Sequence, residues 1–361
     1  MKAHFITNLP APYKLVCFAE IARLMPGFFV TFERTSDDAR RWEETLAEAK
    51  FDFTVMAPGR LRRFCQWFAI GLGRGPFPIH GNYSAPGAVV AIFLHILLRR
   101  PYGLWSAATL RDWRPGSALN RWIKRLLFSR ARIVFCPGEA AAAHARAHGA
   151  KHVAITRNCI DVDALDTDLA AAGAVRDGSP RLVYIGRLSP EKDVATAIRA
   201  LARLDNGATL RLVGFGPEEA ALRTLARELG VADRVEFVGY REGVELAREY
   251  AMAEIMILPS LSEPWGLVVN EAMQAGAVVV ATRVIGCAPD LIEDGVTGFL
   301  FDPGDDAGLA DILASILGDR ERRERVRLAA REKIRGSVPV IFARGLIDGV
   351  RVALNPKAEN R

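Results

Sequence analysis

The sequence has few cysteines and no long apolar run. Its five cysteines, in 361 residues, are an odd number, lie far apart and include no C-x-x-C pair. This spacing argues against a disulfide scaffold or a zinc site and predicts a cytoplasmic protein. The most apolar stretch, residues 85–98, ends at two arginines and is shorter than the ~20 residues of a membrane-spanning helix. Prolines interrupt residues 1–14, so we expect neither a signal peptide nor a membrane span.

Acidic residues are nearly missing from one segment of the chain. Residues 60–132 contain thirteen Lys or Arg and a single acid, Asp112, although the whole chain has a net charge of only +6. Such an excess favours an anionic partner, such as a phosphate, an anionic membrane surface or a nucleic acid, and a solvated basic face is an equally good interpretation. No recognition helix, RRM or zinc motif accompanies the basic segment, so we expect no nucleic-acid binding. Four of the six tryptophans lie in it: Trp67, Trp105, Trp113 and Trp122.

From residue 181 onward, short β-branched runs alternate with helical stretches rich in Ala, Leu, Glu and Arg. This alternation predicts a parallel, doubly wound sheet with right-handed crossovers. The first half has strand patterns of the same kind and predicts a second α/β sheet. The expected strands are His4–Thr7, Phe28–Phe32, Phe53–Ala57, Gly103–Ser106, Ile133–Cys136 and Val153–Asn158, then Leu182–Ile185, Thr209–Val213, Val235–Val238, Ile255–Leu258, Val278–Ala281 and Gly298–Phe301.

We therefore expect an α/β protein with two Rossmann-like domains. The first domain is predicted over residues 1–168 and the second over residues 169–339, with a polar linker over residues 161–180. The tail, residues 340–361, is amphipathic and follows the second sheet, so we expect it to cross back onto the first domain.

The first charged segment at a predicted strand end is Gly186–Lys192. It opens a predicted helix, with Ser189 as the N-cap and Pro190 in the first turn. Arg187 and Lys192 can reach one point above the strand end, where ligands of doubly wound sheets bind. A helix N-terminus there also favours anions, so this segment predicts a diphosphate site.

The second charged segment carries two carboxylates, Glu263 and Glu271, with seven residues between them. Both lie close to the start of a predicted helix over residues 266–274. Carboxylates at this edge can accept hydrogen bonds from sugar and ribose hydroxyls, although two isolated glutamates are more often solvated than functional. The backbone N–H groups of the first helical turn can hold a phosphate oxygen. These N–H groups belong to Gly266, Leu267 and Val268.

These two segments, with Gly214–Glu218 and Gly239-Tyr240 between them, resemble glycosyltransferase family four. The resemblance is strongest over residues 153–336. Members of that family are retaining enzymes of the GT-B fold, in which two Rossmann-like domains face a central cleft. The resemblance implies a nucleotide-diphosphate sugar as donor and no metal or other cofactor. It implies that Gly186, Arg187 and Lys192 hold the diphosphate, that Glu263 lies by the transferred sugar and Glu271 by the ribose, and that Gly214, Gly216 and Tyr240 border the nucleotide.

For the acceptor, the resemblance is less specific. Many relatives carry a histidine near the donor sugar, where this chain has residues 105–109, Trp-Ser-Ala-Ala-Thr. His80, in a glycine-containing turn, is our candidate acceptor-side residue, whereas His95 in an apolar helix is expected in the core. Residues 8–14 resemble a subgroup that makes surface polysaccharides. We therefore expect a glycan or lipid-linked acceptor and a peripheral position at the inner face of the membrane.

Two alternatives have sequence features of their own. A nucleotide-sugar epimerase of related fold would keep the donor site, and product analysis without an acceptor would separate it from a transferase. The pairs Asp161/Asp163 and Asp166/Asp168 match the D-x-D pattern of metal-dependent glycosyltransferases. They fall at the predicted domain junction, so we expect no metal there.

Overall fold

The computed structural model describes residues 1–37, 40–41, 46–47, 49–111, 117–173, 181–205 and 207–355. Asp112, Trp113, residues 174–180 of the predicted linker and residues 356–361 of the predicted tail lie outside these residues. The chain divides into two compact units. Of the described residues, unit 1 contains those of 1–110, 117–159 and 339–355, and unit 2 contains Arg111 and those of 160–338.

Unit 1 is built on a seven-stranded parallel sheet with the order β5-β2-β1-β6-β7-β8-β9. The sequence predicted six of these strands but not β6, which contains Pro78, a residue without a backbone N–H for the ladder. The strands are β1 Ala3–Thr7, β2 Phe28–Phe32, β5 Asp52–Val55, β6 Phe77–His80, β7 Gly103–Trp105, β8 Ile133–Cys136 and β9 Val153–Ile155, beside a small antiparallel pair, β3 Ser36–Asp37 and β4 Arg40–Arg41.

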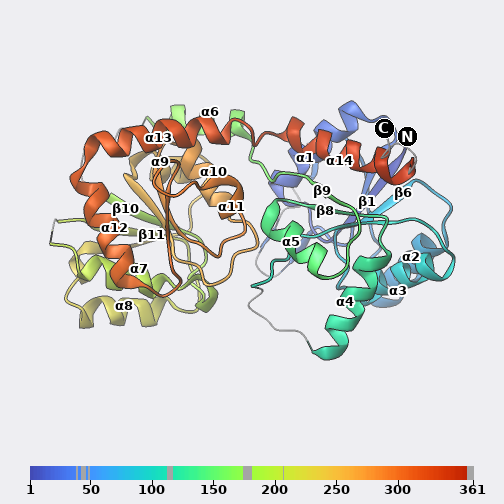
Figure 1. The fold of residues 1–361 in the computed structure, drawn as a ribbon, viewed down its shortest axis with the longest axis horizontal. Coiled ribbons are helices and arrows are strands. Elements are labelled where there is room, and N and C mark those ends of the chain that lie inside the picture. The colour runs from blue at the N-terminus through green and yellow to red at the C-terminus, as the bar shows by residue number, and fades with distance from the viewer. Residues whose placement is uncertain are drawn as a thin grey trace. The chain divides into compact units, whose positions relative to one another are not determined.

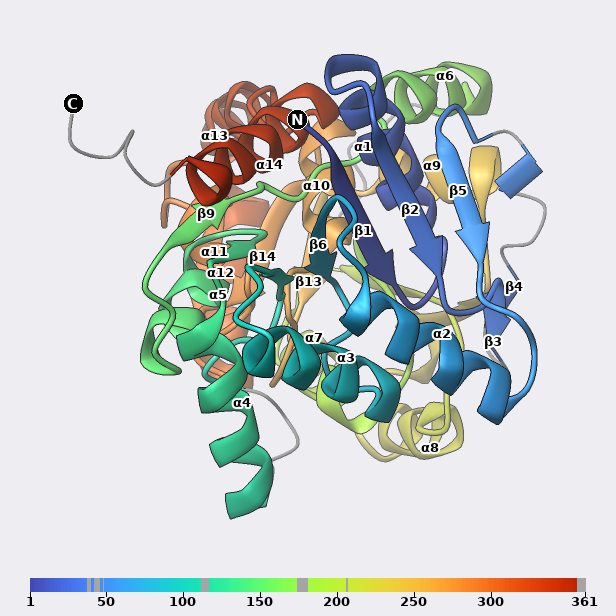
Figure 2. The same cartoon turned by 90° about the vertical axis from the view of Figure 1, so that its right-hand side faces the viewer.

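Helices cover both faces of the unit 1 sheet because successive strand residues point to opposite sides. Phe5 of β1 packs into a cluster with residues of α1 and α14, whereas the next residue, Ile6, packs with residues of α2 and α3. Helices α1 and α14 lie side by side, as do α2 and α3 (Figures 1 and 2). The helices are α1 Pro12–Leu24, α2 Arg60–Leu72, α3 Pro86–Leu97, α4 Ala118–Arg130, α5 Glu139–Ala147 and α14 Pro339–Leu354.

The C-terminal helix α14 belongs to unit 1 and lies directly against its sheet. Two helical glycines permit this approach. A Cβ added at Gly345 would lie 2.4 Å from the carbonyl oxygen of Ile155, and one at Gly349 would lie 2.4 Å from the ring of Phe135. The chain thus returns to the first unit after completing the second.

Unit 2 contains a six-stranded parallel sheet with the order β12-β11-β10-β13-β14-β15. The chain moves outward from β10 in one direction and then starts again at β13 on its other side, so a topological switch point lies between β10 and β13. Ligands of doubly wound sheets bind beyond the carboxyl ends of strands at such a point. The strands are β10 Arg181–Ile185, β11 Thr209–Val213, β12 Val235–Gly239, β13 Ile255–Leu258, β14 Val278–Thr282 and β15 Phe299–Phe301.

The predicted linker and domain boundary differ from the structure, which has helix α6 in their place. The chain changes units between Cys159 and Ile160, and residue 168 lies within α6, Val162–Ala172. Asp161 starts this helix by accepting a hydrogen bond from the backbone N–H of Ala164 at 3.0 Å, as an N-cap does. The other helices of unit 2 are α7 Val194–Ala202, α8 Glu219–Glu228, α9 Gly243–Met252, α10 Leu267–Gln274, α11 Ala288–Leu291, α12 Asp306–Gly318 and α13 Arg320–Ile334.

Among the helices in the described ranges, none combines the length and apolar character needed to cross a lipid bilayer.

The close approach of α14 to the sheet gives a stability prediction. Gly→Ala within a helix normally stabilises a protein by about 0.5–1 kcal/mol, but overpacking against a fixed backbone costs about 1–3 kcal/mol. We expect Gly345→Ala to lower the free energy of unfolding, measured by urea denaturation. Gly75→Ala, where an added Cβ meets nothing within 4 Å, is the control and should leave stability unchanged. Equal stability of the two variants would contradict the packing described.

Candidate functional site

The loop after β10 differs from its predicted form. Pro190–Lys192 forms a 3₁₀ turn, and α7 starts only at Val194. Asp193 has φ 46°, a left-handed conformation that interrupts the helix, and its carboxylate accepts a hydrogen bond from the Thr196 hydroxyl at 2.6 Å. Ser189 holds the N-cap position of this 3₁₀ turn but makes no capping hydrogen bond, and the residue before α7 is Asp193 instead. Lys192 therefore lies before the α-helix and not in its first turn.

The structure brings the two charged segments together. The ammonium group of Lys192 forms an ion pair with the Glu263 carboxylate, and both side chains are mostly buried. The backbone supports the same contact, because the N–H of Leu261 donates to the carbonyl of Glu191 at 2.9 Å. The loops after β10 and β13 are thus joined at the switch point.

Arg187 lies on the same loop as Lys192, and its side chain is mostly exposed. Its guanidinium donates to the Glu191 carboxylate at 2.9 Å, but its side chain is 63% exposed. An exposed ion pair of this kind contributes about 0–1 kcal/mol to stability. Replacing Glu191 by another anion as the partner of Arg187 therefore costs little free energy. One buried and one exposed cation therefore flank the end of β10.

Two glycines allow the loop after β11 to lie against the loop after β10. A Cβ at Gly214 would lie 2.0 Å from the carbonyl oxygen of Gly186, and one at Gly216 would lie 2.2 Å from that of Leu188. Between these contacts, the N–H of Leu188 donates to the carbonyl of Phe215 at 3.0 Å. Any side chain at either glycine position would push the loop after β10 out of place.

Two aromatic side chains are exposed at this edge of the sheet. Tyr240, which follows β12, is 61% exposed and Phe215, which follows β11, is 57% exposed. Their ring centroids are 6.2 Å apart with the planes at 72°. The sequence interpretation placed Tyr240 and the stretch 214–216 at the nucleotide but did not name Phe215 as a site residue. The sequence feature that could have identified Phe215 is an aromatic residue placed between two glycines directly after a predicted strand.

Glu271 is more buried than its sequence position suggested. It lies on α10, which begins after Gly266, whose φ of 96° suits glycine. Tyr250 of α9, itself buried, donates its hydroxyl to the Glu271 carboxylate at 2.5 Å. Burial raises the pKa of Glu271 above its usual range, and the Tyr250 hydrogen bond opposes this rise. The sequence interpretation missed Tyr250, because nothing in a single sequence pairs it with Glu271.

His80 does not have the predicted place at the acceptor. It is the last residue of β6, is completely buried and lies among the rings of Trp67, His95 and Tyr102. Burial lowers its pKa well below 6.5. A side chain without solvent contact cannot touch an acceptor in this structure. The prediction failed because the strand extends through His80 and α2 covers it.

The aspartate pairs of the D-x-D pattern lie in and beside α6. Asp161 caps the helix, and Asp166 accepts a hydrogen bond from the side chain of Gln274 at 2.8 Å. Within the described part of the chain, no three His, Cys, Asp or Glu side chains are grouped so that they could hold a metal ion.

Comparison with known proteins identifies the second unit. Residues 167–333 match the family model of Glycosyl transferases group 1. D-inositol 3-phosphate glycosyltransferase of Nocardia farcinica is 36% identical over 200 residues, which are 52% of this chain and 44% of that protein. Sulfoquinovosyl transferase SQD2 of Arabidopsis thaliana is 38% identical over 157 residues, 43% of this chain and 30% of that protein. The chain thus spans less than half of the length of these curated relatives.

Solved structures extend the likeness to both units. HepE of Anabaena, solved in complex with UDP, has a TM-score of 0.79 at 22% identity and covers 97% of this chain and 100% of its own. WaaG, a glycosyltransferase involved in lipopolysaccharide biosynthesis, has a TM-score of 0.65 at 17% identity and covers 96% and 99%. The chain therefore has the GT-B fold, and its second unit carries a Glycosyl transferases group 1 domain.

The contact between the loops after β10 and β11 gives a second prediction. We expect Gly216→Ala to lower the free energy of unfolding by about 1–3 kcal/mol, because its Cβ would overlap the Leu188 carbonyl. Gly318→Ala, at the end of α12 with open space around its Cβ, should be neutral or slightly stabilising. Urea unfolding of both variants measures the difference, and a neutral Gly216→Ala would mean that the loops do not touch.

Proposed function

We propose that this chain is a retaining, metal-independent glycosyltransferase that moves a sugar from a nucleotide-diphosphate sugar to a glycan or lipid-linked acceptor. The observation that carries the proposal is the meeting of Lys192 and Glu263, with Arg187 beside them, at the switch point of unit 2. The relatives named above are transferases, which argues against the epimerase alternative. HepE, which has the same fold, was solved with UDP and with UDP-glucose, so UDP is the first donor nucleotide to test.

The two cations suit a leaving diphosphate in different ways. Lys192 is held in place by Glu263 and retains N–H donors for a phosphate oxygen, because an ammonium group has three. Arg187 can turn from Glu191 to the diphosphate. The first N–H groups of α10 offer further donors, and all of these stabilise negative charge as it develops on the diphosphate. A divalent cation is then unnecessary for that purpose.

Retention follows if the acceptor attacks on the face from which the diphosphate departs. The bond between the anomeric carbon and the diphosphate oxygen breaks as the acceptor oxygen bonds to that carbon. The departing phosphate oxygen takes the acceptor proton, so no protein base is needed. Glu263, close to Lys192, would accept hydrogen bonds from the transferred sugar.

The nucleoside would lie over the ends of β11 and β12. Tyr240 and Phe215 offer exposed ring surfaces to a base, since aromatic rings bind flat groups by stacking. Glu271 would accept hydrogen bonds from ribose hydroxyls. Tyr250 holds this carboxylate in position through its hydroxyl.

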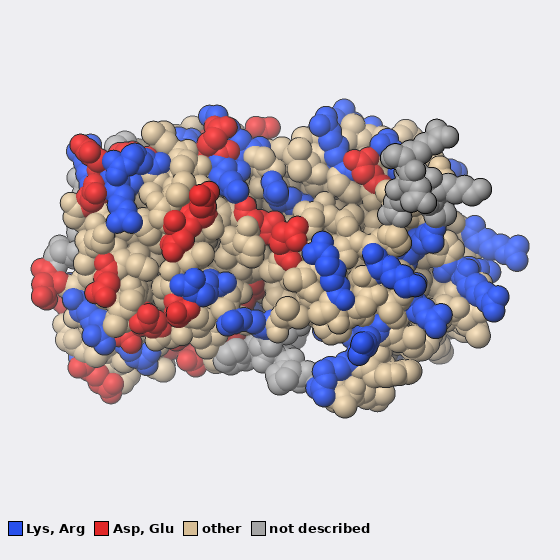
Figure 3. All heavy atoms as spheres, in the orientation of Figure 1, with Lys and Arg blue, Asp and Glu red and all other residues tan. Residues whose placement is uncertain are grey.

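The basic segment of unit 1 supports an anionic acceptor or membrane surface. On the face of unit 1 that Figure 3 shows on the right, basic side chains predominate and few acidic ones lie among them. Helix α2 adds exposed apolar side chains to this charge, namely Leu61, Phe64 and Phe68 beside Arg60 and Arg62. A helix that exposes both kinds of side chain can lie in a membrane interface. We therefore propose peripheral binding at the inner face of the membrane.

The diphosphate site can be tested without knowing the sugar. We expect UDP to bind in excess EDTA, and Arg187→Ala or Lys192→Ala to weaken binding about 10- to 100-fold, the equivalent of about 1.5–3 kcal/mol for a charged hydrogen bond. Arg223→Ala is the control, because Arg223 forms an exposed i,i+4 pair with Glu219 like that of Arg187 with Glu191. Calorimetric titration measures all three. Binding that requires added Mn²⁺ would refute the metal-free proposal.

Glu271 and Tyr250 give a pH prediction. Protonation removes the acceptor that ribose needs, so UDP affinity should fall as the pH falls toward the raised pKa of Glu271. Tyr250→Phe removes the interaction that lowers this pKa, so the fall should begin at a higher pH. The Glu271→Gln variant has no titratable group at this position, so its UDP affinity should not show this fall with pH. Because the pKa of Glu271 is raised in the folded protein, the folded state binds a proton more readily than the unfolded state, so the contribution of Glu271 to the free energy of unfolding increases as the pH falls. Identical pH profiles for wild type and Glu271→Gln would exclude the ribose role.

Membrane binding is testable by co-sedimentation with liposomes. We expect binding to require anionic lipid and to weaken with salt, because basic residues near an anionic leaflet contribute about 1 kcal/mol each and salt screens them. Phe64→Glu, on the exposed side of α2, should reduce it further. Equal sedimentation with neutral and anionic liposomes would contradict the proposal and leave the donor site unaffected.

A further inference from the structure

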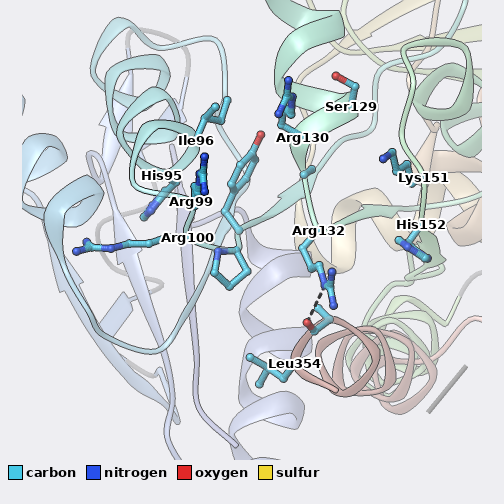
Figure 4. A pocket seen from close by; sticks show the side chains of 14 residues that line it. His95, Ile96, Arg99, Arg100, Ser129, Arg130, Arg132, Lys151, His152 and Leu354 are labelled. Atoms are coloured by element: carbon cyan, nitrogen blue, oxygen red, sulfur yellow. Dashed lines mark hydrogen bonds between the residues drawn. The ribbon is translucent and has the colours of Figure 1, made fainter. Parts of the chain in front are cut away.

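Unit 1 contains a basic cavity that the proposed transfer reaction does not use. Its volume is about 820 Å³, and none of its fourteen lining residues is acidic. Arg99 lies on one side of this space and Lys151 on the other, with Arg130 and Arg132 between them (Figure 4). A space of this size accommodates a whole small molecule and not only an ion.

The cavity lies at the amino ends of three neighbouring strands. Arg99 and Arg100 precede β7, Arg130 and Arg132 lie just before β8, and Lys151 precedes β9. Ligands of doubly wound sheets, which here would be the sugar donor and the acceptor, bind at the opposite edge, beyond the carboxyl ends of the strands. The cavity is therefore separate from any site expected for the transferred sugar or its acceptor.

Two of the cations are explained by the fold alone. Helices that alternate with parallel strands end at this edge, and their last carbonyls carry partial negative charge. Arg100 donates to the carbonyls of Leu72 and Gly73 at the end of α2, the latter at 2.9 Å. Arg132 donates to the carbonyl of Ala353 at the end of α14 at 3.1 Å. These arginines cap helices and need no ligand.

The other three cations form no such hydrogen bond to a helix end. Within the described residues, Arg99, Arg130 and Lys151 make no side-chain hydrogen bond and no ion pair. Burial and the nearby Arg100 lower the pKa of His95 in the cavity wall to about 4, so the histidine is neutral at pH 7. Three like charges that face one cavity repel each other, and an anion between them removes that repulsion.

Arg99 occupies a position that usually belongs to glycine. It lies two residues past the end of α3 with φ 54°. The N–H of Arg99 donates to the carbonyl of Ile96 (3.1 Å) and the N–H of Arg100 to that of His95 (2.8 Å), which forms a Schellman motif. Glycine is the common residue at this left-handed position because it has no Cβ. The chain thus places a guanidinium at the cavity despite a backbone conformation that arginine disfavours.

We propose that this cavity binds a small soluble ligand that carries two phosphate groups, recognised by Arg99, Arg130 and Lys151. Cations on three separate segments of the chain match a ligand with more than one phosphate, because each segment can reach a different part of it. The wall formed by Ile96, Pro101 and Leu354 leaves room for an apolar or sugar-like body between the phosphates.

The test measures thermal stabilisation by fructose 1,6-bisphosphate, with sulfate at equal ionic strength as the reference. The parent protein is the Arg187→Ala/Lys192→Ala variant, which weakens phosphate binding at the proposed donor site, so that the comparison of variants in this parent reports on the cavity. We expect the bisphosphate to raise the Tm of this parent above the sulfate reference. Arg99→Gly in the same parent should have an unchanged or higher Tm without ligand, because glycine relieves the backbone, yet bind the bisphosphate at least tenfold more weakly.

Two further variants separate recognition from general charge. Arg130→Gln should weaken bisphosphate binding, whereas Arg125→Gln, an exposed cation on the same helix, should not. Dihexanoyl phosphatidic acid, a water-soluble lipid, tests the other source of phosphate. The proposal is overturned if the bisphosphate gives no more stabilisation than sulfate, if Arg99→Gly and Arg130→Gln retain the full effect, or if only the lipid binds.

Discussion

The ion pair between Lys192 and Glu263 joins the two loops on which the candidate donor site depends. One loop follows β10 and the other follows β13, and the two residues are 71 positions apart in the sequence. Such a mostly buried pair adds little net stability, because the loss of hydration offsets much of the attraction. Its contribution is positional: it holds an ammonium group and a carboxylate at the switch point of the sheet, beside the amino end of α10.

The remaining features of the site depend on how closely the loops approach. Gly214 and Gly216 let the loop after β11 lie against residues 186–188, and the exposed ring of Phe215, between these glycines, lies 6.2 Å from that of Tyr240. Glu271 is anchored separately, by Tyr250 of α9. The cations, the carboxylates and the rings thus come from four different strand ends, as a doubly wound sheet allows.

Much of unit 2 could be predicted because its strands are short apolar runs bounded by turn residues. The strands Thr209–Val213 and Ile255–Leu258 have the predicted bounds. Contacts between distant residues were beyond the sequence. Tyr250 and Glu271 lie on different helices, and no spacing rule pairs them. Ser189 matched an N-cap by type, but the left-handed Asp193 delays the helix.

The place of His80 in unit 1 could not be predicted because tertiary packing sets its burial. His80 followed a short apolar piece and preceded a glycine, so a turn was the natural expectation, whereas the strand and α2 enclose it. In unit 2, the part of the predicted linker that forms α6 was wrong for a different reason. Its aspartates suggested a polar loop, but Asp161 caps a helix whose alanines favour that conformation.

A crystal structure of the protein grown with UDP and EDTA would test the central claim most directly. We expect the diphosphate to contact Arg187 and Lys192 beside the start of α10, with the ribose at Glu271 and the base near Phe215 and Tyr240. Electron density for UDP elsewhere in the chain, with Lys192 and Glu263 untouched, would contradict the assignment of the donor site.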